Sequence, residues 1–256
     1  MKILMIGLGS IGQRHLRNIK RVYGEEAQIL AYRVRGLKRT FSDTMQIREN
    51  VSLEEEYNIK SFDDLSKALL EKPDIAYITN ITKSHIPCAI ACAKAGCHLF
   101  LEKPISDSLD GIEELAKIAA EKKLKVFVGY QNRFHPGIQY LKQFLAEGSI
   151  GRILSVRSVV GERLTTMHTY ENYKDTYMAR KDMGGGVLLN QMVHELDYLY
   201  YLFGQPCMRW VALTEISGSM WKTIWTRSTA MRQNREPSRY RYMRIFTSIR
   251  QAVLSR

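Results

Sequence analysis

Short apolar runs alternate with amphipathic segments along the first 130 residues. A short apolar run between turn residues predicts a buried strand, and apolar residues three to four positions apart predict a helix. The predicted strands cover residues 2–6, 27–33, 74–79, 98–101 and 125–130, and the predicted helices cover 11–22, 62–70, 84–95 and 108–121. Because the connections are short, this alternation requires a parallel sheet with helices on both faces. We therefore expect a doubly wound α/β domain over residues 1–130.

The pattern changes after residue 130, where strands no longer alternate regularly with helices. Helices are expected over residues 136–147 and 187–203, and strands over 152–162 and 209–216. We expect an incomplete α+β domain at residues 131–216 and a basic tail of uncertain structure at 217–256.

A glycine motif connects the first predicted strand to the first predicted helix. Residues 7–12 read Gly-Leu-Gly-Ser-Ile-Gly, a GxGxxG sequence in the context of a dinucleotide site. Gly7 allows the tight turn, Gly9 lets a pyrophosphate approach the backbone, and Gly12 lets helix and strand pack closely. Together with Ser10 and Ile11 these residues are the candidate phosphate-binding backbone of a Rossmann domain. A purely structural glycine turn is the alternative.

The second predicted strand ends without an acidic residue. It reads Ala31-Tyr32-Arg33-Val34-Arg35, whereas NAD-binding domains commonly place a carboxylate here for the ribose 2′-hydroxyl. A guanidinium group suits a 2′-phosphate instead. Arg33 and Arg35 therefore slightly favour NADP over NAD, although both could be solvated turn residues.

Composition excludes several classes of protein. A chain of 256 residues that is 45% hydrophobic can bury a core, so it is not a disordered protein. No apolar run approaches the length of a membrane span, and the stretch 3–6 is too short for a signal peptide, so we expect a cytoplasmic protein. The four cysteines contain no CxxC pair, which indicates reduced core cysteines and no metal site.

The net charge of +12 is concentrated near the C-terminus. Residues 209–256 hold ten basic and two acidic residues, which leaves 28 basic and 24 acidic residues before them. The body is therefore almost neutral, and the tail has few interleaved aromatic residues. We expect no nucleic-acid partner.

Two further motifs point to a known family. Glu102-Lys103-Pro104 closes the strand at 98–101, and the glycines 184–186 precede a segment that contains Asn190 and His194. With the glycine motif, residues 1–208 resemble the Gfo/Idh/MocA oxidoreductase family. The resemblance implies an N-terminal Rossmann domain, a C-terminal domain with a mostly antiparallel sheet, and hydride transfer between NAD(P) and a sugar-like substrate. The segment before the three glycines is similar to members associated with nucleotide sugars.

The resemblance also implies catalytic roles. Lys103 would donate to the reacting oxygen and orient substrate and cofactor, and His194 would be the general acid or base. Asn190 stands where the family commonly has Asp; it can bind a substrate hydroxyl but cannot take a proton. Asp197, one turn after His194, would either orient the imidazole or pair with a charge. Without the motif, His194 would read as a core histidine.

Other site residues follow from the same resemblance. Asn80, His85 and Glu102 match the cofactor side of the family's site. Tyr173 and Arg180 belong to a loop that would cover the substrate, where an arginine could bind phosphate or carboxylate. Residues 132–136 match the hinge into the second domain, with a structural role for the histidine before the proline.

The basic tail allows three interpretations. It could be a frame change or other truncation, a basic amphipathic helix over about residues 239–254, or a divergent sheet. Family members usually continue further, into the sheet that walls the substrate site and commonly forms the oligomer contact. We therefore expect weak or no turnover and a doubtful homo-oligomer. The alternative function is a non-catalytic nucleotide-binding or sensor protein that keeps only the Rossmann module.

Overall fold

The computed structural model describes residues 1–153, 156–158, 160, 172, 175–176, 180–186, 188–204, 224–229 and 242–247. The chain divides into two compact units. The first contains Met1–Gly129 and Arg180–Gly186, and the second contains Tyr130–Ala179 and Val187–Arg256. The expected domain limits of 131–216 and 217–256 stay a prediction.

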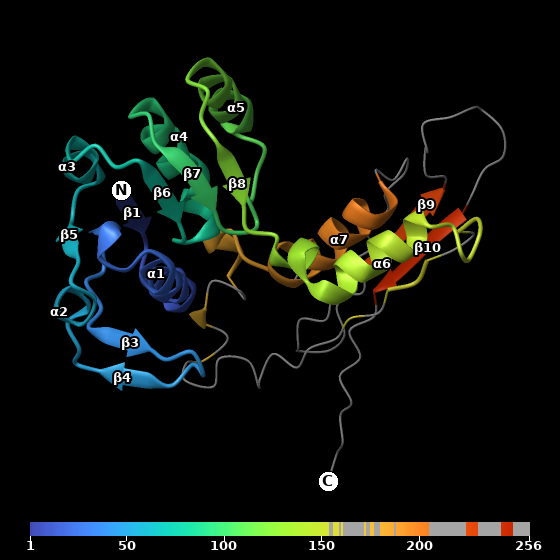
Figure 1. Ribbon diagram of the computed structural model, residues 1–256, viewed down its shortest axis with the longest axis horizontal. Coiled ribbons are helices and arrows are strands. Elements are labelled where there is room, and N and C mark those ends of the chain that lie inside the picture. Colours follow the sequence, from blue (N-terminus) through green and yellow to red (C-terminus); the bar gives the residue numbers. More distant parts are fainter. Residues whose placement is uncertain are drawn as a thin grey trace, which may run out of the picture. The chain divides into compact units, whose positions relative to one another are not determined.

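The first unit is built on one parallel sheet of six strands (Figure 1). The strands are β1 (Lys2–Ile6), β2 (Gln28–Tyr32), β5 (Lys60–Phe62), β6 (Ile75–Ile78), β7 (His98–Leu101) and β8 (Val126–Val128). Their order is β5-β2-β1-β6-β7-β8, so the direction of winding reverses between β1 and β6. This is the Rossmann order, whose ligand crevice lies at the carboxyl ends of the strands next to the reversal. The predicted doubly wound sheet is confirmed.

Helices cover both faces of this sheet because its strands are apolar on both sides. In β1, Ile3 and Met5 pack with α1 (Ser10–Tyr23) and α2 (Leu53–Tyr57). Leu4 and Ile6 point to the opposite core, which is shared with α3 (Leu65–Leu70), α4 (His85–Lys94) and α5 (Ile112–Glu121). Successive strand residues point to opposite faces. A strand buried on both sides therefore reads as the continuous apolar run that the sequence contains.

Two local features differ from the expectations. The helix expected over 62–70 starts only at Leu65, because Asp64 caps it by accepting from the Ser66 N–H at 2.7 Å. Ser61 and Phe62, directly before this cap, lie in β5 opposite Ala31 and Tyr32. The antiparallel pair β3 (Arg39–Phe41) and β4 (Ile47–Glu49) was not predicted from the sequence. Strands of three residues are too short to show a period.

The first α-helix of the second unit is α6 (Pro136–Ala146), close to its expected limits. The helix expected over 187–203 has two parts, a π-helical turn η8 (Leu188–Met192) and the α-helix α7 (Val193–Phe203). Of the strand expected over 152–162, the residues that the structure describes form no regular element, and the strand expected over 209–216 lies outside the described residues.

An antiparallel pair of strands falls in the basic tail. β9 (Ile224–Thr229) pairs with β10 (Tyr242–Thr247), with Tyr242 opposite Thr229. The alternative of a basic helix over 239–254 is therefore wrong at residues 242–247. These residues are rich in aromatic and β-branched side chains, which favour a strand.

Among the helices in the described ranges, none has the length and apolar character of a membrane span.

Leu30 tests how much the first unit depends on its two-sided core. The side chain is fully buried in β2, whereas Leu70 at the end of α3 is 80% exposed. We expect Leu30→Ala to lower the free energy of unfolding by about 2–5 kcal/mol, because it removes transfer energy and leaves a cavity. The matched Leu70→Ala change should stay within about 0.5 kcal/mol. Urea unfolding followed by circular dichroism measures both, and equal losses would contradict this description of the core.

Candidate cofactor and active site

The glycine loop fits tightly against the end of β6. Gly7 has a φ of 89°, and a Cβ there would lie 2.9 Å from the backbone N of Asn80. A Cβ on Gly12 would overlap the Gly7 carbonyl. At Gly9, by contrast, a Cβ would meet nothing within 4 Å. Gly7 and Gly12 are therefore required for the packing of the loop, whereas the position of Gly9 leaves open space beside its backbone.

Two buried side chains hold the carbonyl groups of this loop. The Thr79 hydroxyl donates to the Gly7 carbonyl at 2.6 Å. The Gln13 amide N–H₂ donates to the Leu8 carbonyl at 3.1 Å and to the Arg39 carbonyl at 3.0 Å. The Gly7 and Leu8 carbonyls of the loop therefore already accept hydrogen bonds from protein side chains. The donors of the first turn of α1, which a helix cannot pair internally, are the part suited to an anion.

Asn80 follows β6 and contacts Gly7. Its Nδ2 donates to the Cys88 sulfur at 3.4 Å, while its Oδ1 is buried without a hydrogen-bond partner among the residues that the structure describes. A buried oxygen in this state is unusual. An unpaired acceptor suits an O–H or N–H donor of a dinucleotide, such as a ribose hydroxyl or an amide. The space at Gly9 and a first turn of α1 that has no acidic residue suit its phosphates.

His85 lies behind this loop and not on its surface. It is 1% exposed, and its two ring nitrogens contact the Pro104 carbonyl at 2.9 Å and the Asn80 carbonyl at 3.1 Å. Burial lowers the pKa of His85 against the effect of these two carbonyls. The ring therefore connects the segment after β6 to the segment after β7, which makes it a positioning group.

The Glu102 carboxylate fixes the start of the Lys103 segment. One oxygen accepts a hydrogen bond of 2.6 Å from Nε2 of His15, and the other accepts from the Lys103 main-chain N–H at 3.1 Å. The His15 ring in turn packs edge-on against Phe100, with ring centroids 4.9 Å apart. Glu102 is 9% exposed, and each of its carboxylate oxygens is hydrogen-bonded to a protein group. Lys103 is half-buried at the carboxyl end of β7.

The two arginines after β2 have different surroundings. Arg33 is paired with Glu54 of α2 and donates to the Leu37 carbonyl at 2.5 Å, and its side chain is only 8% exposed. Arg35 is exposed. Only one of the two guanidinium groups that favoured NADP is therefore directed at solvent.

The second unit holds Asn190 and His194 on consecutive helical segments. Asn190 lies in η8 and is 6% exposed, and His194 is half-buried in the first turn of α7. Asp197 accepts two hydrogen bonds from Arg133, at 2.8 Å and 2.6 Å. Of the two readings of Asp197, the structure supports the one in which it pairs with a charge.

The segment Arg180–Gly186 belongs to the first unit although it is distant in sequence. A Cβ on Gly184, which has a φ of 77°, would lie 2.9 Å from the Lys83 backbone N and from the Asp107 carboxylate. Arg180 donates to Asp182 at 2.6 Å, and this contact lowers the pKa of the Asp182 carboxyl. Tyr173 lies outside the described residues.

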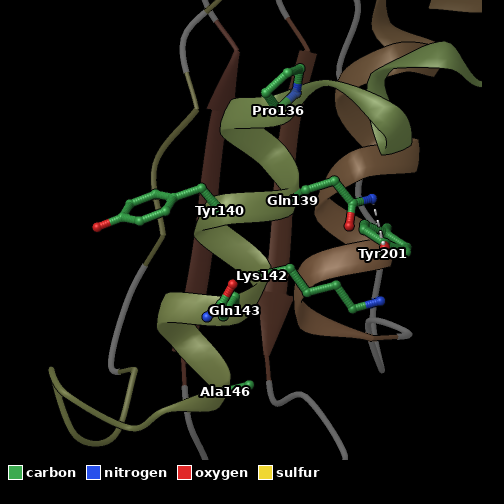
Figure 2. A pocket seen from close by; sticks show the side chains of 7 residues that line it. All are labelled: Pro136, Gln139, Tyr140, Lys142, Gln143, Ala146 and Tyr201. Carbon is green, nitrogen blue, oxygen red and sulfur yellow. Dashed lines mark hydrogen bonds between the residues drawn. The ribbon is translucent and has the colours of Figure 1, made fainter.

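A surface hollow of about 620 Å³ lies along α6 in the second unit (Figure 2). Lys142 and Gln139 point toward Tyr201, and the Lys142 nitrogen lies 3.4 Å from the centre of that ring. Hydrogen bonds from Lys142 and from Gln139 lower the pKa of Tyr201. None of the predicted site residues lines this hollow. In the part of the chain that is described, no group of three or more His, Cys, Asp or Glu could hold a metal ion.

Four residues of the first unit that matter to the site escaped the sequence analysis. Thr79 and Gln13 hold the glycine loop, His15 binds Glu102, and Glu54 binds Arg33. Their partners are 5 to 87 positions away in the chain. The only local signal was the position of Gln13 and His15 directly after the third glycine, on the helix that the motif opens.

Comparison with known families decides the identity of the chain. The family described as "Oxidoreductase family, NAD-binding Rossmann fold" matches residues 1–130, and the "GFO/IDH/MocA C-terminal domain" matches residues 138–224. The chain belongs to the GFO/IDH/MocA oxidoreductase family. The resemblance extends beyond residue 208, where the motifs alone had placed its end, because the C-terminal match includes residues up to 224.

Curated relatives are 26% and 29% identical to this chain over the aligned residues. Myo-inositol 2-dehydrogenase of Thermotoga maritima is 26% identical over 207 residues, which are 80% of this chain and 55% of that protein. 2,7-anhydro-N-acetylneuraminate hydratase of Escherichia coli is 29% identical over 160 residues, which are 61% of this chain and 40% of the hydratase. The chain therefore spans about half the length, or less, of these relatives.

A solved structure has the same fold. The WlbA dehydrogenase from Bordetella pertussis, in complex with NADH and UDP-GlcNAcA, matches with a TM-score of 0.76 at 19% identity. The match covers 99% of this chain and 68% of the WlbA chain.

Two glycines of the loop should separate folding from nucleotide binding. Gly12→Ala places a Cβ against the Gly7 carbonyl, so we expect a loss of about 1–3 kcal/mol in unfolding free energy. Gly9→Ala enters open space at an ordinary φ of −71° and should leave stability unchanged. It should still weaken NADH binding about tenfold or more, by filling space beside the amides. Thermal unfolding and NADH fluorescence titration measure the two effects; unchanged NADH affinity in Gly9→Ala would contradict the assignment of the loop.

The carboxyl of Glu54 should make stability depend on acid pH. Burial alone would raise its pKa, but hydrogen bonds from Ser61, from its own backbone and from Arg33 lower it from 4.5 to about 2. A lowered pKa in the folded state contributes stability above the unfolded pKa, and this contribution is lost as pH falls from about 4.5 to about 2.

We therefore expect wild type to exceed Glu54→Gln by about 1 kcal/mol near neutral pH, a value discounted because the carboxylate is 39% exposed. The difference should shrink as the pH falls through that range. Urea unfolding at a series of pH values measures it, and a difference that stays constant would argue against the pairing.

Proposed function

We propose that this chain binds a nicotinamide dinucleotide and transfers hydride between it and a hydroxyl or keto group of a sugar or nucleotide sugar. The observation that carries the proposal is the glycine loop, whose carbonyls are held by Thr79 and Gln13 while space stays open at Gly9. The relatives support the substrate class, since one is an inositol dehydrogenase and another was solved with NADH and UDP-GlcNAcA.

The first unit supplies the residues that would hold the dinucleotide. The amides of Gly9, Ser10, Ile11 and Gly12 would bind its diphosphate. The Asn80 Oδ1, at the end of β6, would accept a hydrogen bond from a hydroxyl or amide of the dinucleotide. When bound, the nicotinamide supplies the hydride donor or acceptor. His85 and Glu102 would position neighbouring segments of the site without contacting the dinucleotide, because their polar atoms are hydrogen-bonded to the protein.

Lys103 is our candidate for the group that stabilises charge on the reacting oxygen. Its ammonium would donate to the hydroxyl or to the alkoxide that develops there. The contact from the Lys103 main-chain N–H to Glu102, with His15 on the other side of that carboxylate, holds the start of its segment. A side chain whose backbone is fixed in this way loses less freedom when it contacts the substrate.

His194 and Asn190 are our candidates for the proton-transfer side of the reaction. His194 would accept the hydroxyl proton during oxidation and return it during reduction. Asn190 would bind a neighbouring hydroxyl through its amide. Tyr173 and Arg180 would act on the rest of the substrate; Arg180 already pairs with Asp182, so a phosphate or carboxylate would have to compete for it.

A second candidate function is a nucleotide-binding or sensor protein without turnover. The specific observation in its favour is Asn190, a buried amide where the family commonly has a proton-accepting carboxylate. NADH binding without any change of its 340 nm absorbance, across a panel of cyclitols, sugars and nucleotide sugars, would favour the sensor. Substrate-dependent oxidation of NADH, or reduction of NAD, favours the oxidoreductase. Weak turnover, the cytoplasmic location and the doubtful oligomer stay predictions.

The role assignments are tested by removing the two side chains. We expect Lys103→Ala and His194→Ala each to lower the turnover rate by about 10²-fold or more while NADH still binds. Lys117→Ala and His98→Ala remove a lysine and a histidine at exposed sites of the first unit and should leave the rate unchanged. Stopped-flow absorbance with the substrate found in the panel measures the rates. Near-native turnover in either variant would refute the role given to that residue.

A further inference from the structure

The end of β2 lies next to the glycine loop. The Tyr32 carbonyl accepts a hydrogen bond from the Gly7 N–H at 3.2 Å, and the following Arg33 N–H donates to the Phe62 carbonyl at 2.9 Å. In a Rossmann domain this is the place where the 2′ position of the adenosine ribose is recognised. The surroundings of the Arg33 side chain therefore bear on the choice between NAD and NADP.

The Arg33 guanidinium is already committed to the protein. One nitrogen pairs with Glu54, a second donates to the Leu37 carbonyl at 2.5 Å, and only 8% of the side chain is exposed. A phosphate that took over this guanidinium would have to break the ion pair and leave the Glu54 carboxylate without its cation. This exchange opposes phosphate binding, because the Arg33 side of the ion pair is shielded from water, but it costs less than breaking a fully buried pair since Glu54 is partly exposed.

The Glu54 carboxylate is held in place and still faces solvent in part. Its Oε1 accepts from the Ser61 hydroxyl at 2.6 Å, its Oε2 accepts from the Ser52 hydroxyl at 3.3 Å, and 39% of the side chain is exposed. The carboxyl is ionised at neutral pH, since its pKa is about 2. The fold thus brings to the end of β2 the negative charge that the sequence of β2 lacks.

We propose that Glu54 is a selectivity residue that withholds Arg33 and makes this chain prefer NAD(H) to NADP(H). The inference rests on the proposed dinucleotide site. A 2′-phosphate would add negative charge beside a carboxylate, whereas the 2′-hydroxyl of NAD adds none and can donate a hydrogen bond to an acceptor. The slight preference for NADP expected from Arg33 and Arg35 is thereby reversed, because exposed Arg35 alone gives a weak, screened attraction.

The test compares the affinities of NADH and NADPH in the full chain, measured by fluorescence titration at constant ionic strength. Wild type should bind NADH more tightly than NADPH. Glu54→Gln should shift the affinity ratio toward NADPH by about tenfold, chiefly by tightening NADPH, because Arg33 becomes available to the phosphate. Glu54→Gln combined with Arg33→Gln should lose this gain.

Glu56→Gln is the matched control. Glu56 lies two positions further along α2, pairs with Arg48 and is 34% exposed, so its replacement removes the same charge from the same helix. The NADH to NADPH ratio of this variant should equal that of wild type. An equal shift in Glu56→Gln and Glu54→Gln would reduce the effect to net charge and overturn the inference.

The inference and the proposed function fail in different ways. If neither nucleotide binds to wild type, the dinucleotide site itself is refuted. If both bind but wild type prefers NADPH, or the ratio is unmoved in folded Glu54→Gln, only the inference is overturned. If Glu54→Gln does not fold, Arg33→Gln decides: NADPH affinity within about twofold of wild type supports a withheld guanidinium, and a loss of about tenfold or more overturns it.

Discussion

The cofactor side of the molecule depends on the close approach of the glycine loop to the end of β6. Thr79 binds the Gly7 carbonyl, and the space that a Cβ of Gly12 would need is filled by the same carbonyl. The loop can pass this close to β6 only because these positions lack side chains. With the carbonyls held inward, the first turn of α1 presents its donors at the reversal of the sheet, where a parallel α/β fold binds its ligands.

Carboxylates that bind side chains from distant segments recur in both units. Glu54 holds Arg33, Glu102 binds His15, and Asp197 binds Arg133. Each carboxylate orients its partner side chain within its own unit, and each is at least partly shielded from water, where such contacts are stronger than at the surface. The charges near the site are therefore arranged by the fold, and adding up basic residues along the sequence misjudges them.

The amino-acid pattern was sufficient for the parts of the structure that are local. The apolar runs placed the strands at residues 2–6 and 98–101 correctly, and the glycine motif located the loop, because a buried strand and a tight turn each impose their own composition. The β3–β4 pair was missed because each strand is three residues long. Contacts such as His15 to Glu102, 87 positions apart, follow from the order of strands in the sheet, which periodicity does not encode.

The segment Arg180–Gly186 has a consequence for how the chain is assembled. The first unit is not one continuous stretch of sequence, since residues 130–179 separate its main part from this segment. Gly184 sits against the backbone of Lys83 and the Asp107 side chain, at the loops that follow β6 and β7. During synthesis, the nucleotide-binding unit can form its sheet early, yet its surface beside those loops is complete only after much of the second unit has left the ribosome. A protein cut after Gly129 would therefore lack the segment Arg180–Gly186 of the first unit and would expose to solvent the surface that this segment covers.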